Sequence, residues 1–320
     1  MMDVSVPPYR TNKQLAAIAL GIVALQLAII PMFALPQGAA LAGAVAVLLS
    51  LSTPFTRALL HEAIHGRLVR RKDWNTRLGR ALAIGTGISF DAIRLGHMTH
   101  HRFPRHVLDR ADIVEPGSSR FVAGINFYGG LLGGLYLREI LTSVVMLLPR
   151  RAIDFVAAYV MVEDDALNNA LRRGLDRRLA RIRIDSAFVI AIYAVAFYLY
   201  GAWWPVLLMA IALRGLIVSL QDNVAHYDTP PVVGAAAHNS RTVRWARLFM
   251  LNQNLHGIHH DHPEVPWNRL PVAFDRAGSN YSGGYFALLL KQFYGPLPAD
   301  AVALEVTVER DDPGLRRTAA

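Results

Sequence analysis

Three short histidine clusters determine how this chain is organised: His61-Glu-Ala-Ile-His65, His97-Met-Thr-His100-His101 and His256-Gly-Ile-His259-His260. Residues three and four apart lie on one face of a helix, so each cluster is expected to present its imidazoles together, as a single set. Neutral imidazole is a common ligand of iron, copper, zinc and nickel. Eight of the twelve histidines belong to these clusters, and His226 is a ninth candidate. Since this number exceeds what one ion needs, the sequence predicts two metal ions.

The composition indicates a membrane protein. The chain has 320 residues, of which 53% are hydrophobic and 18% are charged, whereas a soluble domain carries about a quarter charged residues. It contains no cysteine, which excludes disulfides, cysteine-ligated iron–sulfur clusters and zinc–thiolate sites and leaves nitrogen and oxygen as metal ligands. The formal charge is +9, but the arginines crowd beside apolar stretches. This pattern favours cytoplasmic loops and anionic lipids over nucleic acid as partners.

The apolar stretches predict four transmembrane helices in two hairpins. Residues 15–35 and 38–55 are each long enough to cross a hydrocarbon layer of about 30 Å, and residues 186–220 form a second apolar pair broken at residues 201–205. Neither turn contains Lys or Arg, whereas seven basic residues follow the second stretch between positions 57 and 80. By the positive-inside rule, both termini and all three clusters are then cytoplasmic. The expected fold is all-α, with a cytoplasmic helical cap holding the metal site.

Other segments are predicted to support this core. Residues 74–97 are expected to form an interfacial or partly buried helix that delivers the second cluster. Residues 121–149 are mostly apolar and contain two overlapping small-xxx-small pairs, which favour close helix packing over space for a substrate chain; their depth in the bilayer stays open. Residues 1–298 are expected to form one domain, followed by a polar tail at 299–320 that is disordered at its end.

Two charged features inside this plan have predicted roles. Residues 167–184 place leucines at helical spacing with six arginines between them, which is typical of a basic amphipathic helix on the membrane surface. Docking of an acidic electron-transfer protein is the alternative for this helix. Arg214 lies inside the fourth apolar stretch, where an isolated charge is costly. Asp222 is its candidate partner.

Histidine clusters of this kind occur in several classes of metal site. The first cluster alone matches the His-Glu-x-x-His pattern of zinc proteases, but such a site leaves most of the other two clusters unused. A single i,i+4 pair is often an ordinary polar pair at a membrane surface, whereas three clusters on one side favour metal binding. A transporter places its ligands near the bilayer midplane, whereas these clusters lie beyond the ends of the predicted spans, so transport is a minor alternative. A non-catalytic metal-binding membrane protein is the alternative of another class. A nitrogen-rich site with two redox metals suits O2 activation and attack on unactivated C–H bonds of a lipid chain.

The clusters resemble the histidine boxes of the membrane fatty acid desaturase superfamily, the di-iron enzymes that include acyl desaturases and related carotenoid ketolases and hydroxylases. The pattern His-x(3–4)-His, His-x-x-His-His, His-x-x-His-His is met in order, and the resemblance extends from Arg57 to about Pro271. The residues around the third box, from Asn254 to the Pro266-Trp267 pair, also look like the family's ending.

The resemblance implies two Fe ions, O2 as co-substrate and a long apolar substrate. It implies a separate electron donor of the ferredoxin or cytochrome b5 type with its reductase. The implied iron ligands are His61, His65, His97, His100, His101, His226, His256, His259 and His260. Glu62 and Asn254 are candidates to orient ligand imidazoles, and Asp222 stands where the family commonly has an Asn four residues before the ligand at position 226. His106 and His262 are read as hydrogen-bonding or surface residues, and His238 has no assigned role.

The expected reaction is desaturation of an acyl chain. Ketolation or hydroxylation of a carotenoid or another apolar chain is the alternative, because the first box has the three-residue interval and the acidic residue after its first His that several carotenoid-modifying members show. Substrate identity and the position of attack depend on a tunnel that no local pattern reveals.

Overall fold

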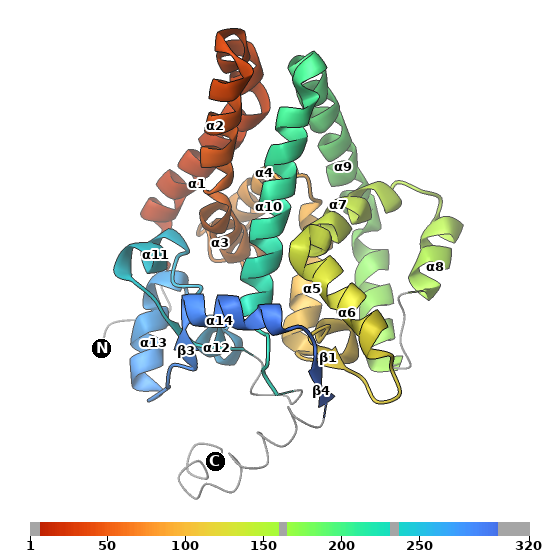
Figure 1. Ribbon diagram of the computed structural model, residues 1–320, viewed down its shortest axis with the longest axis vertical. Helices are drawn as coiled ribbons and strands as arrows, with labels where there is room; N and C mark the ends of the chain where they lie inside the picture. The colour runs from red at the N-terminus through yellow and green to blue at the C-terminus, as the bar shows by residue number, and fades with distance from the viewer. Residues whose placement is uncertain (1–6, 160–164, 231–236, 300–320) are drawn as a thin grey trace, which may run out of the picture.

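Helices are the dominant structure in the computed structural model, which describes residues 7–159, 165–230 and 237–299 (Figure 1). The all-α prediction is therefore confirmed. The α-helices are α1 (Tyr9–Ala24), α2 (Ala39–Ser50), α3 (Thr53–Ile64), α4 (Lys72–Gly85), α5 (Phe90–Arg102), α6 (Arg120–Gly129), α7 (Leu135–Val145), α8 (Arg150–Ala158), α9 (Asp165–Tyr200), α10 (Trp204–Val224), α11 (Arg244–Phe249), α12 (His256–Asp261), α13 (Leu270–Arg276) and α14 (Tyr285–Lys291).

The remaining elements are short. The π-helical segments are η1 (Leu25–Ala34) and η4 (Gly130–Gly134), and the 3-10 segments are η2 (Leu35–Gln37), η3 (Val107–Asp109), η5 (Gly201–Trp203), η6 (Trp267–Arg269) and η7 (Gln292–Tyr294). The strands β1 (Ile113–Val114) and β4 (Leu297–Pro298) pair in parallel, as do β2 (Ser240–Arg241) and β3 (Gly283–Gly284). The predicted polar tail lies outside the described residues from position 300 onward.

The long apolar helices project from one end of the molecule (Figure 1). Two helical segments, Tyr9–Gln37 and Ala166–Val224, are long and apolar enough to cross a membrane, and a third is added if α2 and α3, bent by 41°, count as one span. The segment Ala166–Val224 contains both α9 and α10, which fold back on each other at η5, where the sequence predicted the second hairpin. The first predicted span is one continuous helical run in which Pro31 lies within the π segment, because proline cannot donate a backbone hydrogen bond.

The two hairpins pack together through an apolar core. Its buried residues come from α1, η1, α2, α9 and α10 and are Val23, Leu27, Ile30, Leu35, Ala42, Ala46, Ala196, Tyr200, Leu207 and Ala210. A second core continues below it among α1, α3, α4 and α5, with Leu59, Leu82 and Phe90 completely or almost completely buried. The small residues of α1 and α2 let the helices approach closely, and the second core anchors α3 and α5, which carry the first two histidine boxes.

The glycine-rich part of residues 121–149 packs closely, as predicted. Gly133 has a φ of 114°, a backbone conformation that residues with a side chain rarely adopt. A Cβ added there would lie 3.7 Å from the backbone of Gly215 on α10. At Gly134 an added Cβ would come within 2.2 Å of the carbonyl oxygen of Gly129. The kink between α6 and α7 therefore depends on glycine, and it brings η4 directly against α10.

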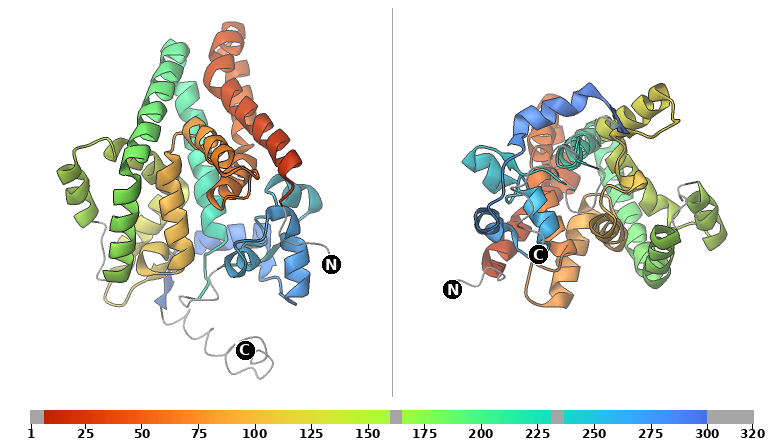
Figure 2. Two further views of the ribbon diagram at one scale, coloured as in Figure 1. Left: turned by 180° about the vertical axis from the view of Figure 1, so that it is seen from behind. Right: turned by 90° about the horizontal axis from the view of Figure 1, so that it is seen from below.

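Two sequence predictions about charged residues are wrong. Residues 167–184 do not form a separate helix on the membrane surface, because they are the first half of α9 and continue without a break into the apolar hairpin (Figure 2, left). Arg214 does not pair with Asp222. It is buried and donates to the hydroxyls of Tyr193 at 2.9 Å and Tyr136 at 3.3 Å, and to the Gln26 side-chain oxygen.

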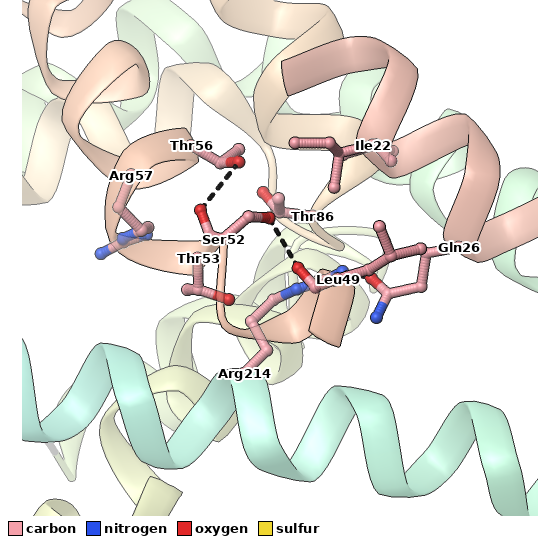
Figure 3. Close-up of a pocket in the computed structure, with 10 residues that line it drawn as sticks. Ile22, Gln26, Leu49, Ser52, Thr53, Thr56, Arg57, Thr86 and Arg214 are labelled. Atoms are coloured by element: carbon pink, nitrogen blue, oxygen red, sulfur yellow. Dashed lines mark hydrogen bonds between the residues drawn. The ribbon is translucent and has the colours of Figure 1, made fainter. Parts of the chain in front are cut away.

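Figure 3 shows the pocket beside this network, where Arg214, Gln26, Thr53 and Thr86 meet between α1, α3 and α10. The buried cation in the apolar region is satisfied by neutral hydrogen-bond partners from several helices rather than by a carboxylate.

Candidate metal centre

The three histidine boxes meet below the apolar hairpins. His61 lies in the last turn of α3 and His65 caps its end; the second box occupies the last turns of α5, and the third forms α12. His226 follows the end of α10. Because α3 and α5 are anchored in the same core, their C-terminal ends bring the first two boxes face to face. His226, two residues after α10, and the separate helix α12 complete the arrangement.

The nine predicted ligand residues form two groups whose potential ligand atoms all lie within 4.8 Å of one another in each group. The first group consists of His61, His65, His97, His101 and His259; the second consists of His100, His226, His256 and His260. No predicted histidine ligand is left out. The prediction of two ion sites rather than one agrees with this division.

The first box sends both of its histidines to one group, as predicted, but the second and third boxes do not act as single sets, and for these two the sequence prediction is wrong. In the second box His97 and His101 belong to the first group, while His100 belongs to the second. In the third box the assignment is reversed, since His256 and His260 belong to the second group and His259 to the first. Residues four apart diverge by only about 40° around a helix, whereas neighbouring residues diverge by about 100°. Each His-x-x-His-His box therefore sends its i,i+4 pair to one group and its middle histidine to the other.

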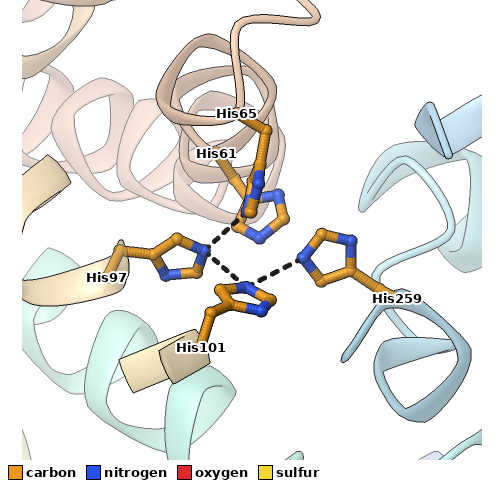
Figure 4. Close-up of side chains that lie close together, drawn as sticks. All are labelled: His61, His65, His97, His101 and His259. Atoms are coloured by element: carbon orange, nitrogen blue, oxygen red, sulfur yellow. Dashed lines mark hydrogen bonds between the residues drawn. The ribbon is translucent and has the colours of Figure 1, made fainter. Parts of the chain in front are cut away.

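The nitrogen spacing within the first group fits a shared ion. The Nε2 atoms of successive histidines are 2.9 Å apart for His65 and His97, 3.1 Å for His97 and His101, and 3.2 Å for His101 and His259 (Figure 4). Two nitrogens about 2.0–2.1 Å from one ion and about 90° apart are separated by about 2.8–3.0 Å. The observed separations are close to this value.

Hydrogen bonding alone cannot account for the same contacts. A neutral imidazole has one N–H and one lone pair on its two nitrogens, yet the single Nε2 of His97 faces the Nε2 atoms of both His65 and His101. Within the described residues, the Nε2 atom of His61 is buried without a hydrogen-bond partner. Converging, incompletely bonded imidazole nitrogens are the donor set that a nitrogen-binding metal ion requires.

The two groups are in direct contact. The rings of His101, in the first group, and His260, in the second, are stacked with centroids 4.4 Å apart. In the second group the Nε2 atom of His260 lies 3.1 Å from that of His100 and 3.2 Å from that of His256, and the ring of His226 packs edge-on against His100. Ions held by the two groups would therefore be neighbours in one dinuclear centre.

Burial favours the uncharged form of several of these histidines. It is the largest cause of a pKa well below the usual value for His97, His256 and His259, and neighbouring histidines lower these pKa values further. The same causes lower the pKa of His101 to about 4. At neutral pH the imidazoles thus have lone pairs free for metal binding without first losing a proton.

Two side chains that support the histidines were missed by the sequence reading. Asp109, in η3, lies 2.6 Å from Nδ1 of His100 and also accepts a hydrogen bond from the backbone N–H of Arg105. A carboxylate on Nδ1 fixes the tautomer that leaves Nε2 free for a metal. The side-chain amide of Gln253 lies 3.1 Å from Nδ1 of His61, and its carbonyl oxygen can occupy this place after rotation of the amide. Neither residue belongs to a box pattern.

The two candidates for orienting imidazoles contact other parts of the chain. Asn254 donates to the carbonyl of Ser240 at 2.7 Å, and Ser240 donates its N–H back to the carbonyl of Asn254. Asn254 thus holds the start of α12 against β2. Glu62 is buried and accepts a hydrogen bond from the backbone of Trp267. In the part of the chain that the structure describes, neither contact reaches a box histidine.

Asp222 belongs to an ion network instead. Arg57 forms two hydrogen bonds to Glu139 of α7, at 2.9 and 3.0 Å, and one to Asp222 of α10 at 3.2 Å. Arg57 lies one helical turn before His61, and Asp222 lies one turn before His226. The network therefore ties the helix that supplies the first group to the helix that leads to the second.

The three remaining histidines lie outside both groups. His262 is half-exposed at 3.6 Å from Glu264, and His106 is partly buried in the loop after α5. His238, which had no predicted role, lies 2.8 Å from the carbonyl of Tyr227 through its Nε2, and its backbone carbonyl accepts from Gly257. His238 thus joins the segment around His226 to the start of the third box.

Comparisons with known proteins agree with this centre. The family model described as fatty acid desaturase matches residues 37–288, which include all nine clustered histidines. No curated protein matches the sequence. The matched region is well over half of the chain and holds both histidine groups, so the chain belongs to the fatty acid desaturase family.

Proposed function

We propose that this protein is a membrane-bound, non-haem di-iron oxidase that uses O2 to introduce a double bond into an acyl chain. The observation that carries the proposal is the division of nine imidazoles into two adjoining groups, five and four, with no cysteine ligand. Two neighbouring nitrogen-rich sites suit a pair of redox ions better than a single zinc, which takes three or four ligands. The family match supplies the reaction class, which is oxidation of a lipid chain.

Each group would hold one iron, and bound iron supplies O2 activation and the removal of hydrogen from an unactivated C–H bond. The chain's own residues do the positioning. Asp109 holds His100 through Nδ1, and the carboxamide of Gln253 lies at Nδ1 of His61. His259 is 3% exposed and is packed beside buried Leu255 and Ile258, so the first group is shielded from bulk water. Shielding protects a reactive oxidant from side reactions.

The electron balance requires a donor. Reduction of O2 to two waters takes four electrons and four protons, and conversion of CH2–CH2 to CH=CH supplies two of each. The other two electrons must come from outside, so we propose a separate one-electron carrier of the ferredoxin or cytochrome b5 type with its reductase.

The proposed topology has four spans. They are the first helical run, the bent pair α2–α3, and α9 and α10 as two separate crossings, with residues 1–298 forming one domain. Arginine-rich segments near the histidine end and turns without Lys or Arg at the other end support a cytoplasmic site with both termini on that side.

Product analysis tests the reaction. Membranes from cells that express the protein would be supplied with acyl lipids and 18O2, and products would be weighed by mass spectrometry. We expect products lighter by two hydrogens that contain no 18O and that are absent from the His259→Ala variant. Products that carry one 18O atom would show oxygen insertion, as in a ketolase or hydroxylase, which the short first box favours. Absence of any oxidised product would contradict the proposal.

A further inference from the structure

The first half of α9 carries a stripe of exposed arginines. Arg173, Arg177 and Arg181 follow one another at intervals of four residues, so they lie along one side of the helix. The Arg177 side chain donates to the carbonyl of Arg173 at 3.1 Å, and within the described residues neither Arg173 nor Arg177 forms an ion pair. This side of the helix therefore presents uncompensated positive charge.

The stripe lies one helix away from the histidines. At Gly174 of α9 an added Cβ would come within 2.3 Å of Leu95 of α5, so the two helices are in close contact there. Leu95 lies between Arg94 and the second box, which begins at His97. Packed helices have axes about 8–10 Å apart, so the stripe lies one helix spacing from α5, which supplies His97 and His101 to the first group and His100 to the second.

Arg94 of α5 extends the positive surface toward the centre. Arg94 lies on α5 one turn after Asp91, the carboxylate that Arg181 of α9 contacts at 3.2 Å. Burial lowers the pKa of Arg94; Asp91 opposes this shift, and the charges of Arg178 and Arg181 add to it. The same side of α5 exposes Met98, at 43%, one turn further along the helix. An apolar contact surrounded by charge is the usual composition of a transient protein interface.

The described carboxylates near this surface are bound to other arginines or outnumbered by them, and Asp176, the acid beside Arg177 on α9, pairs with Arg150 of α8. Asp91 and Asp185 are the buried acids below it: Arg80 contacts both at 2.6 Å, and Arg181 contacts Asp91 at 3.2 Å. Together with Arg94 and Arg178, these arginines number four against two carboxylates. A surplus of two positive charges remains before Arg173 and Arg177 are considered.

Anionic lipid head groups are a poor partner for Arg173 and Arg177, because α9 is one continuous helix that carries these residues away from its apolar half. Arg173 precedes Ser186, where the predicted apolar span begins, by 13 residues, or about 20 Å at a rise of about 1.5 Å per residue. The head-group layer of one leaflet is roughly 5–8 Å thick. Even with a tilt of about 20°, Arg173 and Arg177 extend past the lipid into water.

We propose that this surface, formed by Arg173, Arg177 and Arg181 of α9 with Arg94 and Met98 of α5, docks the acidic one-electron carrier that reduces the centre. The inference rests on the proposed function, since only a reaction that consumes two external electrons needs such a partner. Complementary charge raises the rate of encounter and orients the carrier, and α5 lies directly between the surface and both histidine groups.

Binding measurements test the surface apart from catalysis. The protein in phosphatidylcholine nanodiscs would be titrated with a plant-type [2Fe–2S] ferredoxin, an acidic one-electron carrier, at about 20 mM and about 300 mM salt. We expect the Arg173→Glu/Arg177→Glu variant to raise the Kd at least about tenfold at low salt and to flatten its salt dependence. The matched control is Arg244→Glu/Arg276→Glu, which reverses two exposed arginines on α11 and α13, on the other side of the molecule (Figure 1), and should leave the Kd unchanged.

Several outcomes would overturn the proposal: no measurable binding to the wild type at low salt, an unchanged Kd in the α9 variant, or an equal loss in the control. Loss of stabilisation by anionic lipid with an unchanged Kd would assign the arginines to the membrane instead. A single turnover, in which the centre is reduced anaerobically with dithionite, freed of excess reductant and then given O2 and substrate, needs no docking and separates the two hypotheses. Wild type that forms no oxidised product with dithionite contradicts the proposed function, whereas a variant active with dithionite but slow with ferredoxin supports the docking surface.

Discussion

The nine clustered histidines and the network around Arg214 are both buried groups of polar side chains, yet their geometry differs. In the Arg214 network each donor faces its own acceptor: Arg214 contacts three neutral side chains, and Tyr193 donates to the carbonyl of Gly85 at 3.1 Å. In the histidine centre, Nε2 atoms face one another, and that of His61 is buried without a hydrogen bond within the described residues.

This difference separates structure from function. A network whose members satisfy one another needs nothing further and holds helices together. A cluster whose like atoms converge needs a ligand that accepts all of them, and here the converging atoms are lone-pair donors suited to a metal ion. We therefore expect changes in the histidine centre to affect metal content and activity, and changes around Arg214 to affect stability.

The largest expected effect is that of a histidine in either group. Replacing His100 or His259 by Ala should lower the iron content and abolish activity, because each residue supplies one of the converging nitrogens, while membrane insertion stays intact. Iron content and product formation would be measured on membranes with equal amounts of protein. His262→Ala is the matched control, since His262 is half-exposed and lies in neither group. Full activity in His259→Ala would remove that residue from the ligand set.

Loss of the carboxylate behind His100 should have a smaller effect. In Asp109→Asn the 2.6 Å contact to Nδ1 loses its charge, and such changes typically cost about 10–100-fold in metal affinity or activity. Iron affinity would be followed by competition with a chelator. Asp154→Asn, which alters an exposed ion pair with Arg150, is the control. An iron affinity equal to that of the control would show that Asp109 has no orienting role.

An intermediate case is the Arg57 network, which is structural but lies beside both groups. Arg57→Met leaves Glu139 and Asp222 without their cation, and we expect a loss of stability on the order of 2–3 kcal/mol because Asp222 is partly exposed. Activity should fall several-fold, since α3 and α10 are no longer tied together. The triple variant Arg57→Met/Glu139→Gln/Asp222→Asn should recover much of the thermal stability. A triple variant less stable than Arg57→Met would contradict this explanation.

The smallest effect on activity is expected at Arg214. In Arg214→Met, Tyr193 keeps its bond to Gly85 and Gln26 keeps its 2.9 Å bond to Ser50, so mainly the Gln26 oxygen loses a partner. We expect a cost of about 1–3 kcal/mol, seen as a Tm lower by several degrees with iron content unchanged. Iron loss comparable to that in His259→Ala would erase the distinction between the two clusters.

The sequence predicted the helical class, the two hairpin turns and eight of the clustered histidines, because i,i+3 and i,i+4 spacing is a local property. The ninth, His226, lies outside the boxes and was assigned as a ligand through the resemblance to the family. The sequence could not predict that His100 and His259 each belong to a different group from the other histidines of their own box, since this depends on how α5 and α12 face each other. It also missed Asp109, nine residues after His100, and Gln253, because their contacts arise from a loop and from packing between distant segments. The arginines of residues 167–184 were misplaced for a related reason. Their amphipathic pattern fits a surface helix equally well, and only the continuity of α9 excludes it.

If the two histidine groups hold two irons, as we propose, the metal content of the purified wild-type protein will show it most directly. The protein would be purified in detergent under air, and its metals counted per chain by mass spectrometry. We expect about two irons per chain, one for each group, and little zinc. A single zinc ion without iron would contradict it and would favour a zinc protease or a metal sensor instead.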